Sequence, residues 1–130
     1  MKTRIKPFAM ATSGFIFLLI AGCYPIHDES NCEDEVLSSK KSLDGENRAT
    51  LTLRSCGSTT PASKIIRLQK IDPENTNNQG HGERIYITTA EGDLPFHWEG
   101  NLLRIEAPET GQHIFLSKGK WGNTDIAYFR

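Results

Sequence analysis

Apolar and polar residues alternate with a period of two along much of the chain after residue 31. Residues 48–54 show this most clearly, because Ala49, Leu51 and Leu53 fall on one face of an extended strand. The residues between and beside them are polar: Arg48, Thr50, Thr52 and Arg54. Since successive side chains of a strand point to opposite faces, the pattern predicts a β-strand with one apolar and one polar face.

A turn signal lies shortly before this strand. Asp44-Gly45 is a dipeptide that favours tight turns between antiparallel strands. Val36 and Leu37 lie upstream of the turn. We therefore expect residues 35–39 to pair with residues 48–55 as a β-hairpin.

Further short segments rich in β-branched and aromatic residues follow, and they predict strands at 64–71, 85–88, 96–98, 102–107, 113–117 and 125–129. Phe96 and Trp98 should share one face of their strand. Residues 72–84 are polar and predict a loop, and the segment around Gly119, Trp121, Gly122 and Asn123 predicts a turn. Without a helical period in these residues, the sequence predicts an all-β fold: a small antiparallel meander, sandwich or partly open barrel of about six to eight short strands.

The start of the chain has a different pattern. Lys2, Arg4 and Lys6 precede an apolar stretch, Phe8 to Ile20, which ends in Ala21-Gly22-Cys23. The stretch is shorter than the about 20 apolar residues that span a membrane, and small residues before a cysteine are typical of a bacterial lipoprotein signal. We expect residues 1–22 to be a cleaved signal, Cys23 to carry the lipid (palmitate among its acyl groups), residues 23–31 to form a tether and residues 32–130 to form the domain.

Two alternatives for this leader are a plain secretory signal and an uncleaved anchor. Tyr24 follows Cys23, where an Asp would favour retention at the inner membrane in many Gram-negative bacteria. The expected location is therefore the cell envelope, with the lipid in the outer membrane and the domain facing the periplasm.

Three cysteines are an odd number for an exported protein. Lipidation of Cys23 leaves Cys32 and Cys56 as a pair in an oxidising compartment, which predicts a disulfide between them. The alternative is a redox or metal-binding thiol pair. The absence of a Cys-x-x-Cys spacing and of a nearby histidine disfavours it.

Charge narrows the classes of partner. Removing Lys2, Arg4 and Lys6 with the leader leaves 12 of the 15 basic residues against 16 acidic ones, a formal charge of −4. Nucleic acid requires clustered Lys and Arg, so no nucleic-acid partner is expected. The linear sequence also shows no polybasic segment for anionic lipid, so we expect the N-terminal lipid to attach the chain to the membrane.

The segment from Cys32 to Thr60 resembles a family of small bacterial exported proteins and lipoproteins of unknown function, whose hallmarks are a Ser-Pro-Asp-Gly turn and a Cys-Gly-Ala-Thr-Thr segment. The matching residues here are Ser42-Leu43-Asp44-Gly45 and Cys56-Gly57-Ser58-Thr59-Thr60, with Leu43 in place of the proline and Ser58 in place of the alanine. The resemblance implies a β-rich envelope domain with this cysteine pair. It implies no activity.

Candidate chemistry is sparse. Gly-x-Ser-x-Gly and His-Glu-x-x-His motifs are absent, and the histidines His27, His81, His97 and His113 have no metal-ligand spacing. We therefore predict no catalytic residue, no metal ligand and no cofactor. His81, between two glycines, and Trp121, in a predicted turn, are the candidate contact residues.

The sequence thus predicts a lipid-anchored envelope protein that binds another envelope component without catalysis, through its sheet edges and residues 72–84. One alternative is an inhibitor or immunity lipoprotein that blocks a periplasmic hydrolase. Another is an enzyme or small-ligand carrier with a site built from His81, His113 and Asp125. A third is a purely structural envelope protein.

Overall fold

The computed structural model describes residues 31–74, 81–107 and 112–130. The predicted signal (1–22), the predicted lipidation residue Cys23, His27 and almost all of the predicted tether lie outside the described residues. Within the described ranges there is no helix long and apolar enough to cross a membrane.

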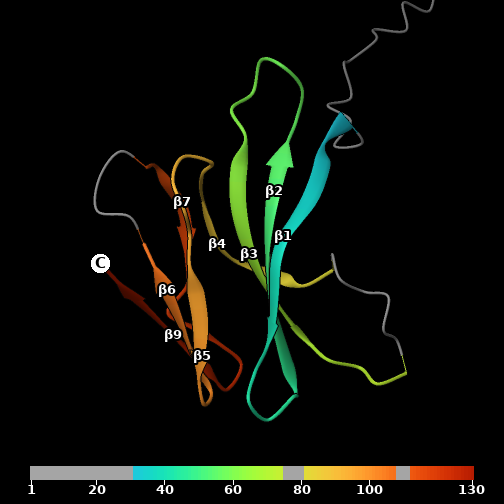
Figure 1. Cartoon of the computed structure of the whole chain (residues 1–130), viewed down its shortest axis with the longest axis vertical. Helices are drawn as coiled ribbons and strands as arrows, with labels where there is room; N and C mark the ends of the chain where they lie inside the picture. Colours follow the sequence, from blue (N-terminus) through green and yellow to red (C-terminus); the bar gives the residue numbers. More distant parts are fainter. Residues whose placement is uncertain (1–30, 75–80, 108–111) are drawn as a thin grey trace, which may run out of the picture.

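Two β-sheets form the domain (Figure 1). The five-stranded sheet has the order β1-β2-β3-β4-β7, and the four-stranded sheet has the order β5-β6-β9-β8. The strands are β1 (Glu33–Lys41), β2 (Asn47–Ser55), β3 (Ser63–Lys70), β4 (Glu83–Thr89), β5 (Phe96–Glu99), β6 (Leu102–Glu106), β7 (Ile114–Ser117), β8 (Lys120–Trp121) and β9 (Thr124–Phe129). The all-β prediction is confirmed, including the hairpin of β1 and β2.

Two details differ from the prediction. The segment predicted as a turn contains the two-residue strand β8, which pairs with β9 across a tight turn where Gly122 has φ +56°. In addition, β6 and β9 pair in parallel, so the sheets are not purely antiparallel. The reason is the path of the chain: after β6 it crosses to the five-stranded sheet to form β7, and it returns through β8, so that β9 reaches β6 in the same direction.

The core lies between the sheets. Alternation in β2 and β3 turns Ala49, Leu51, Ile66 and Leu68 inward, as predicted. Residues of the opposing sheet complete the cluster, namely Phe96, Leu103, Ile105 and Ile126. Burial of these side chains provides the main free energy that holds the sheets together.

The other face of β2 is also buried, which the alternation did not predict. Thr50 and Thr52 point away from the core, yet each is almost fully buried. The side chain of Arg67 on β3 extends across this face to Asp34 on β1, with 3.5 Å between Nη2 and Oδ2. Thr52 lies between these two residues in the strand register, so the arginine stem covers it.

The predicted disulfide is present. Cys32 and Cys56 are bonded at the open end of the β1–β2 hairpin, with 4.1 Å between their Cα atoms and a sequence separation of 24 residues. Closing a loop of that length contributes roughly 3–4 kcal/mol in the chain-entropy account. The bond ties the first described residues to the C-terminal end of β2.

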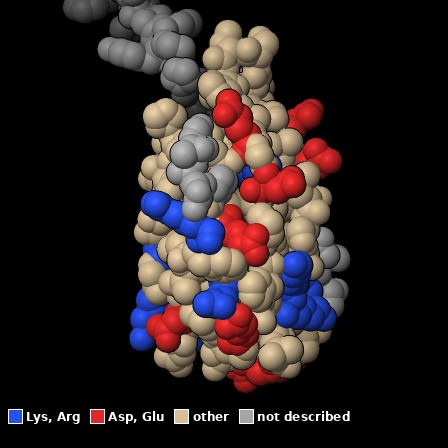
Figure 2. Space-filling view, turned by 60° about the vertical axis from the view of Figure 1, so that its left-hand side comes forward, with Lys and Arg blue, Asp and Glu red and all other residues tan. Residues whose placement is uncertain are grey.

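Charges of both signs are interspersed on the face shown in Figure 2, and acidic side chains predominate toward its upper end. This face therefore offers no continuous basic surface. The mixture of charges on this face agrees with the small formal net charge of the whole chain, which is −1.

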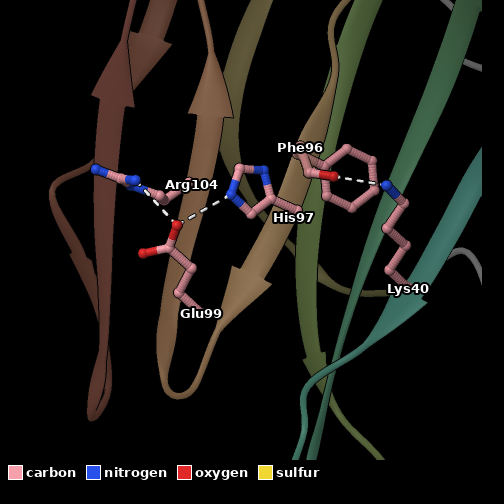
Figure 3. A network of polar contacts seen from close by, with 5 residues as sticks. All are labelled: Lys40, Phe96, His97, Glu99 and Arg104. Carbon is pink, nitrogen blue, oxygen red and sulfur yellow. Dashed lines mark hydrogen bonds and ion pairs between the residues drawn. The ribbon is translucent and has the colours of Figure 1, made fainter.

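One seam between the sheets is closed by side chains. The edge strand β1 meets the edge strand β5, where Lys40 Nζ donates a hydrogen bond to the Phe96 carbonyl oxygen at 2.7 Å (Figure 3). Trp98 Nε1 donates in return to the Lys40 carbonyl oxygen at 3.1 Å. Lys40 also lies over the Phe96 ring, 5.0 Å from its centroid. These contacts cover the C-terminal end of β1, around Lys40.

Candidate binding groove at the open seam

The opposite seam, between β7 and the four-stranded sheet, is open. Strand β7 is the last strand of its sheet and pairs with β4 alone. An edge strand presents unpaired backbone N–H and C=O groups on its free side. The two sheets are joined at the end of β7 by Lys118, whose N–H bonds the Ile85 carbonyl oxygen and whose own carbonyl oxygen accepts the Tyr128 hydroxyl at 2.7 Å.

A groove of about 350 Å³ lies beside this edge. It is lined mainly by aromatic and apolar side chains, with a serine and the terminal arginine as polar members: Tyr86, Ala107, Ile114, Ser117, Tyr128, Phe129 and Arg130. The accessible lining is about as polar as it is apolar, so the groove offers hydrogen-bonding groups as well as apolar contacts to a bound segment.

Strand β7 carries two exposed apolar side chains, of which Ile114 lines the groove and Phe115 is the next residue along the strand. Ile114 is 53% exposed and Phe115 is 66% exposed. Phe115 has no partner on β4, because the register of β4 and β7 shifts there and pairs Ile87 with Leu116 but Thr88 with Ile114. This bulge frees Phe115 from the sheet.

The floor of the groove contains a phenol without a well-formed hydrogen bond. Tyr86 is fully buried, and its hydroxyl has no hydrogen-bond partner of standard geometry among the described residues. The neighbouring Thr88 hydroxyl directs its one proton toward Gln112 Oε1 and the His113 carbonyl oxygen. Burial raises the pKa of Tyr86, and an interaction with the Thr88 side chain opposes this shift in part. A buried hydroxyl without a well-formed hydrogen bond costs free energy.

Tyr86 reaches the interior because of a second irregularity. The register of β3 and β4 shifts between Ile66 and Arg67, so that Ile85 and Tyr86 both join the core although they are consecutive. The Tyr86 ring packs against the Tyr128 ring with 5.4 Å between their centroids. Burial raises the pKa of Tyr128 to about 12.

His97 lies on the outer face of β5, as predicted, and belongs to a surface network (Figure 3). Its Nε2 is 3.2 Å from Glu99 Oε1, which also accepts a hydrogen bond from Arg104 Nη1 at 2.9 Å. Hydrogen bonds from His97 and then Arg104 lower the pKa of Glu99. The rings of His97 and Phe129 meet edge to face at 5.8 Å. The network contains no Ser, Cys or Thr nucleophile and covers an open sheet face.

Trp121 is half-buried and packs against the core, so it is less exposed than a free contact residue would be. Its Nε1 donates to Glu83 Oε2 at 2.9 Å, and Lys118 bonds the other oxygen of the same carboxylate. Hydrogen bonds from Lys118 and then Trp121 lower the pKa of Glu83. His81 is exposed two residues before Glu83. The two candidate contact residues therefore belong to the same end of the sandwich.

A second, more polar groove of about 470 Å³ opens at that end. Carboxylates, amides and one aromatic ring line it: Glu46, Asn47, Lys70, Glu83, Trp121, Gly122, Asn123 and Thr124. Neither groove is lined by His81, His113 or Asp125, the three residues of the scattered-site alternative. The described residues also hold no group of three or more His, Cys, Asp or Glu side chains suited to a metal ion.

Comparisons with known proteins supply no relative. No protein-family model matches the chain, and neither a curated protein nor a solved structure matches it. The candidate site therefore depends on the geometry of this chain alone.

The Tyr128 pKa leads to a testable pH dependence. Because the folded pKa of about 12 lies above the ordinary value of 10.0, the stability associated with the neutral phenol is complete below pH 10 and is lost as the pH rises toward 12. Alkaline titration followed by phenolate absorbance should show late ionisation of Tyr86 and Tyr128, and Tyr128→Phe should have one late-ionising tyrosine fewer than the unaltered chain. Ionisation of every tyrosine near pH 10, in protein that still has a native circular dichroism spectrum, would contradict this burial.

Proposed function

We propose that this chain is a lipid-anchored envelope protein whose β-sandwich binds an extended segment of a partner envelope protein along β7. One observation carries the proposal: the unpaired edge strand β7 presents exposed Ile114 and Phe115 beside a groove. A segment that adds to β7 would satisfy the free backbone groups and place alternate side chains in the groove.

The distribution of exposed apolar residues supports a binding role for the sheet edges. Among the described residues five large apolar side chains are exposed, and four of them belong to the edge strands β1 and β7 of one sheet: Val36, Leu37, Ile114 and Phe115. Soluble domains usually blunt such edges with charges or cover them. The Lys40 end of β1 is already occupied by β5, whereas the described strands leave the whole of β7 free on one side.

The anchor is supported by the leader pattern and by the placement of the cysteines. Cys32 and Cys56 are consumed by the disulfide, which leaves Cys23 as the remaining thiol of the chain. A lipid on Cys23 would hold the domain close to the membrane that carries its partner. Confinement to one surface raises the effective concentration of partners, so that a small interface is sufficient.

The anchor is tested by metabolic labelling with a fatty acid analogue. Cys23→Ala should abolish label incorporation, because it removes the acylated sulfur. Cys56→Ser, which removes a different cysteine, should retain the label. Label that persists in Cys23→Ala would disprove the anchor.

The β7 interface is tested by site-specific photo-crosslinking in intact cells. A crosslinker in place of Phe115 should give one discrete adduct with an envelope protein. Adding Ile114→Asp to that crosslinking variant should reduce the adduct at least tenfold, because burial of a large apolar side chain contributes about 1.5–3 kcal/mol.

Leu43 provides the matched control, since it is 80% exposed and lies in the turn between β1 and β2, outside the strands. A crosslinker at Leu43 should give no such adduct, and Leu43→Asp should leave capture at position 115 unchanged. Equal capture at both positions, or no effect of Ile114→Asp in protein with a native circular dichroism spectrum, would refute a β7 interface.

A further inference from the structure

Several basic side chains of the five-stranded sheet lie on its outer face, the face turned away from the core. Strand register identifies the outward positions. Between β1 and β2, Asp34 pairs with Arg54 and Lys41 pairs with Arg48. Between β2 and β3, Thr52 pairs with Ile65 and Thr50 pairs with Arg67, and Arg67 in turn pairs with Arg84 on β4. The outward cations, here called the basic face, are Lys41, Arg48, Arg54, Arg67 and Arg84. Asp34 is the one acidic residue at the outward positions of the described strands of this five-stranded sheet.

Like charges oppose each other directly on this face. Lys41 is the register partner of Arg48, and Arg67 is the register partner of Arg84. Directly opposed like charges destabilise an antiparallel pair. The basic face therefore carries a cost in the isolated domain that a bound anionic group would relieve.

The single carboxylate does not satisfy the arginines. Asp34 lies 3.8 Å from Arg54 Nε and 3.5 Å from Arg67 Nη2, both longer than a charge-assisted hydrogen bond. The Arg67 side chain is 9% exposed and its Nε has no hydrogen-bond partner. Burial, followed by the charge of Arg84, lowers the pKa of Arg67, and Asp34 opposes this shift. Among the described residues, the Nε of Arg67 thus has no acceptor, and Asp34 contacts its Nη2 only at 3.5 Å.

The basic face lies close to the residues from which the predicted tether starts. Asp34 and Arg54 lie two residues from Cys32 and Cys56, and the disulfide fixes the root of the tether at that end of the sheet. The nine residues from Cys23 to Asn31 reach at most about 30 Å when fully extended. A lipid on Cys23 would therefore hold the basic face within one tether length of the membrane surface.

From this charge segregation we infer that the basic face docks on the anionic phosphate headgroups of the membrane that carries the lipid anchor. This inference rests on the proposed anchor. Arginine binds phosphate oxygens through two parallel N–H groups. On the basic face Lys41 and Arg84 are exposed and Arg48 and Arg54 are half-buried, so these four cations are the ones that a surface can reach. The docked face would leave β7 and its groove at the side of the domain, where a partner has access.

Vesicle binding of the unacylated domain tests the inference independently of the anchor. Residues 24–130 contain every described strand, the core and the disulfide. This protein should co-sediment with vesicles of phosphatidylethanolamine and phosphatidylglycerol, bind weakly to vesicles of phosphatidylcholine alone, and dissociate as the salt concentration rises. The double variant Lys41→Gln/Arg84→Gln removes two exposed cations of the basic face and should lower the partition coefficient more than tenfold, at about fivefold per charge.

The matched control is Lys70→Gln/Lys120→Gln, which makes the same change in net charge at exposed positions outside both the basic face and the β7 groove. It should change partitioning less than twofold. Three results would overturn the inference: no preference for phosphatidylglycerol, equal losses in both double variants, or saturable binding of inorganic phosphate without binding to vesicles.

The chain's own acidic residues, Asp28 and Glu29, could compete for the basic face. A chain that begins at Asn31 should bind the vesicles no better than the chain that begins at Tyr24. Vesicle binding by the shorter chain alone would show that its own tether occupies the face, and would overturn the membrane assignment. Because none of these proteins is acylated, failure of this test leaves the labelling result at Cys23 intact.

Discussion

Lys40 and Trp98 join the edge strands of the two sheets by a pair of hydrogen bonds to backbone carbonyl oxygens. These bonds close one seam of the sandwich and bring an otherwise exposed edge, β1, against β5. Among the described residues, the hydrogen bonds that link the sheets at the opposite seam lie at its Lys118 end, where the Tyr128 hydroxyl bonds the Lys118 carbonyl oxygen and Trp121 Nε1 bonds Glu83 Oε2. The groove, the unpartnered Tyr86 hydroxyl and the exposed Phe115 all belong to this open seam. The asymmetry between the seams therefore decides where a partner strand has access.

The fold was predictable from the sequence because it follows from alternation and turn chemistry. Ala49 and Leu51 face the core, Asp44-Gly45 turns the hairpin, and Cys32 meets Cys56. The site was not predictable, because it depends on departures from alternation. The bulges at Ile85 and Phe115 break the period of two, and a bulge leaves no dependable mark in a short strand. The parallel pairing of β6 with β9 depends on the crossover through β7, which local patterns do not encode.

The same distinction explains why the linear sequence shows no basic patch. Lys41, Arg48, Arg67 and Arg84 are far apart along a chain that is acidic overall after the leader, and only the register of four strands places them on one face. The molecule thus has two separate surfaces with different chemistry. One is a groove at a free strand edge, and the other is a basic sheet face next to the Cys32–Cys56 disulfide. With the proposed lipid anchor, the domain would use both at once, one toward the membrane and one toward a partner.

Residue-resolved amide hydrogen exchange tests the asymmetry of the seams most directly. With the closed and open seams as described, amides of β2 and β3 and those near Lys40 and Phe96 should exchange slowly, and the β7 amides that point away from β4 should exchange at least about 100-fold faster. Equal protection of β7 and β3 would show that the second seam is closed in solution, and would contradict the account.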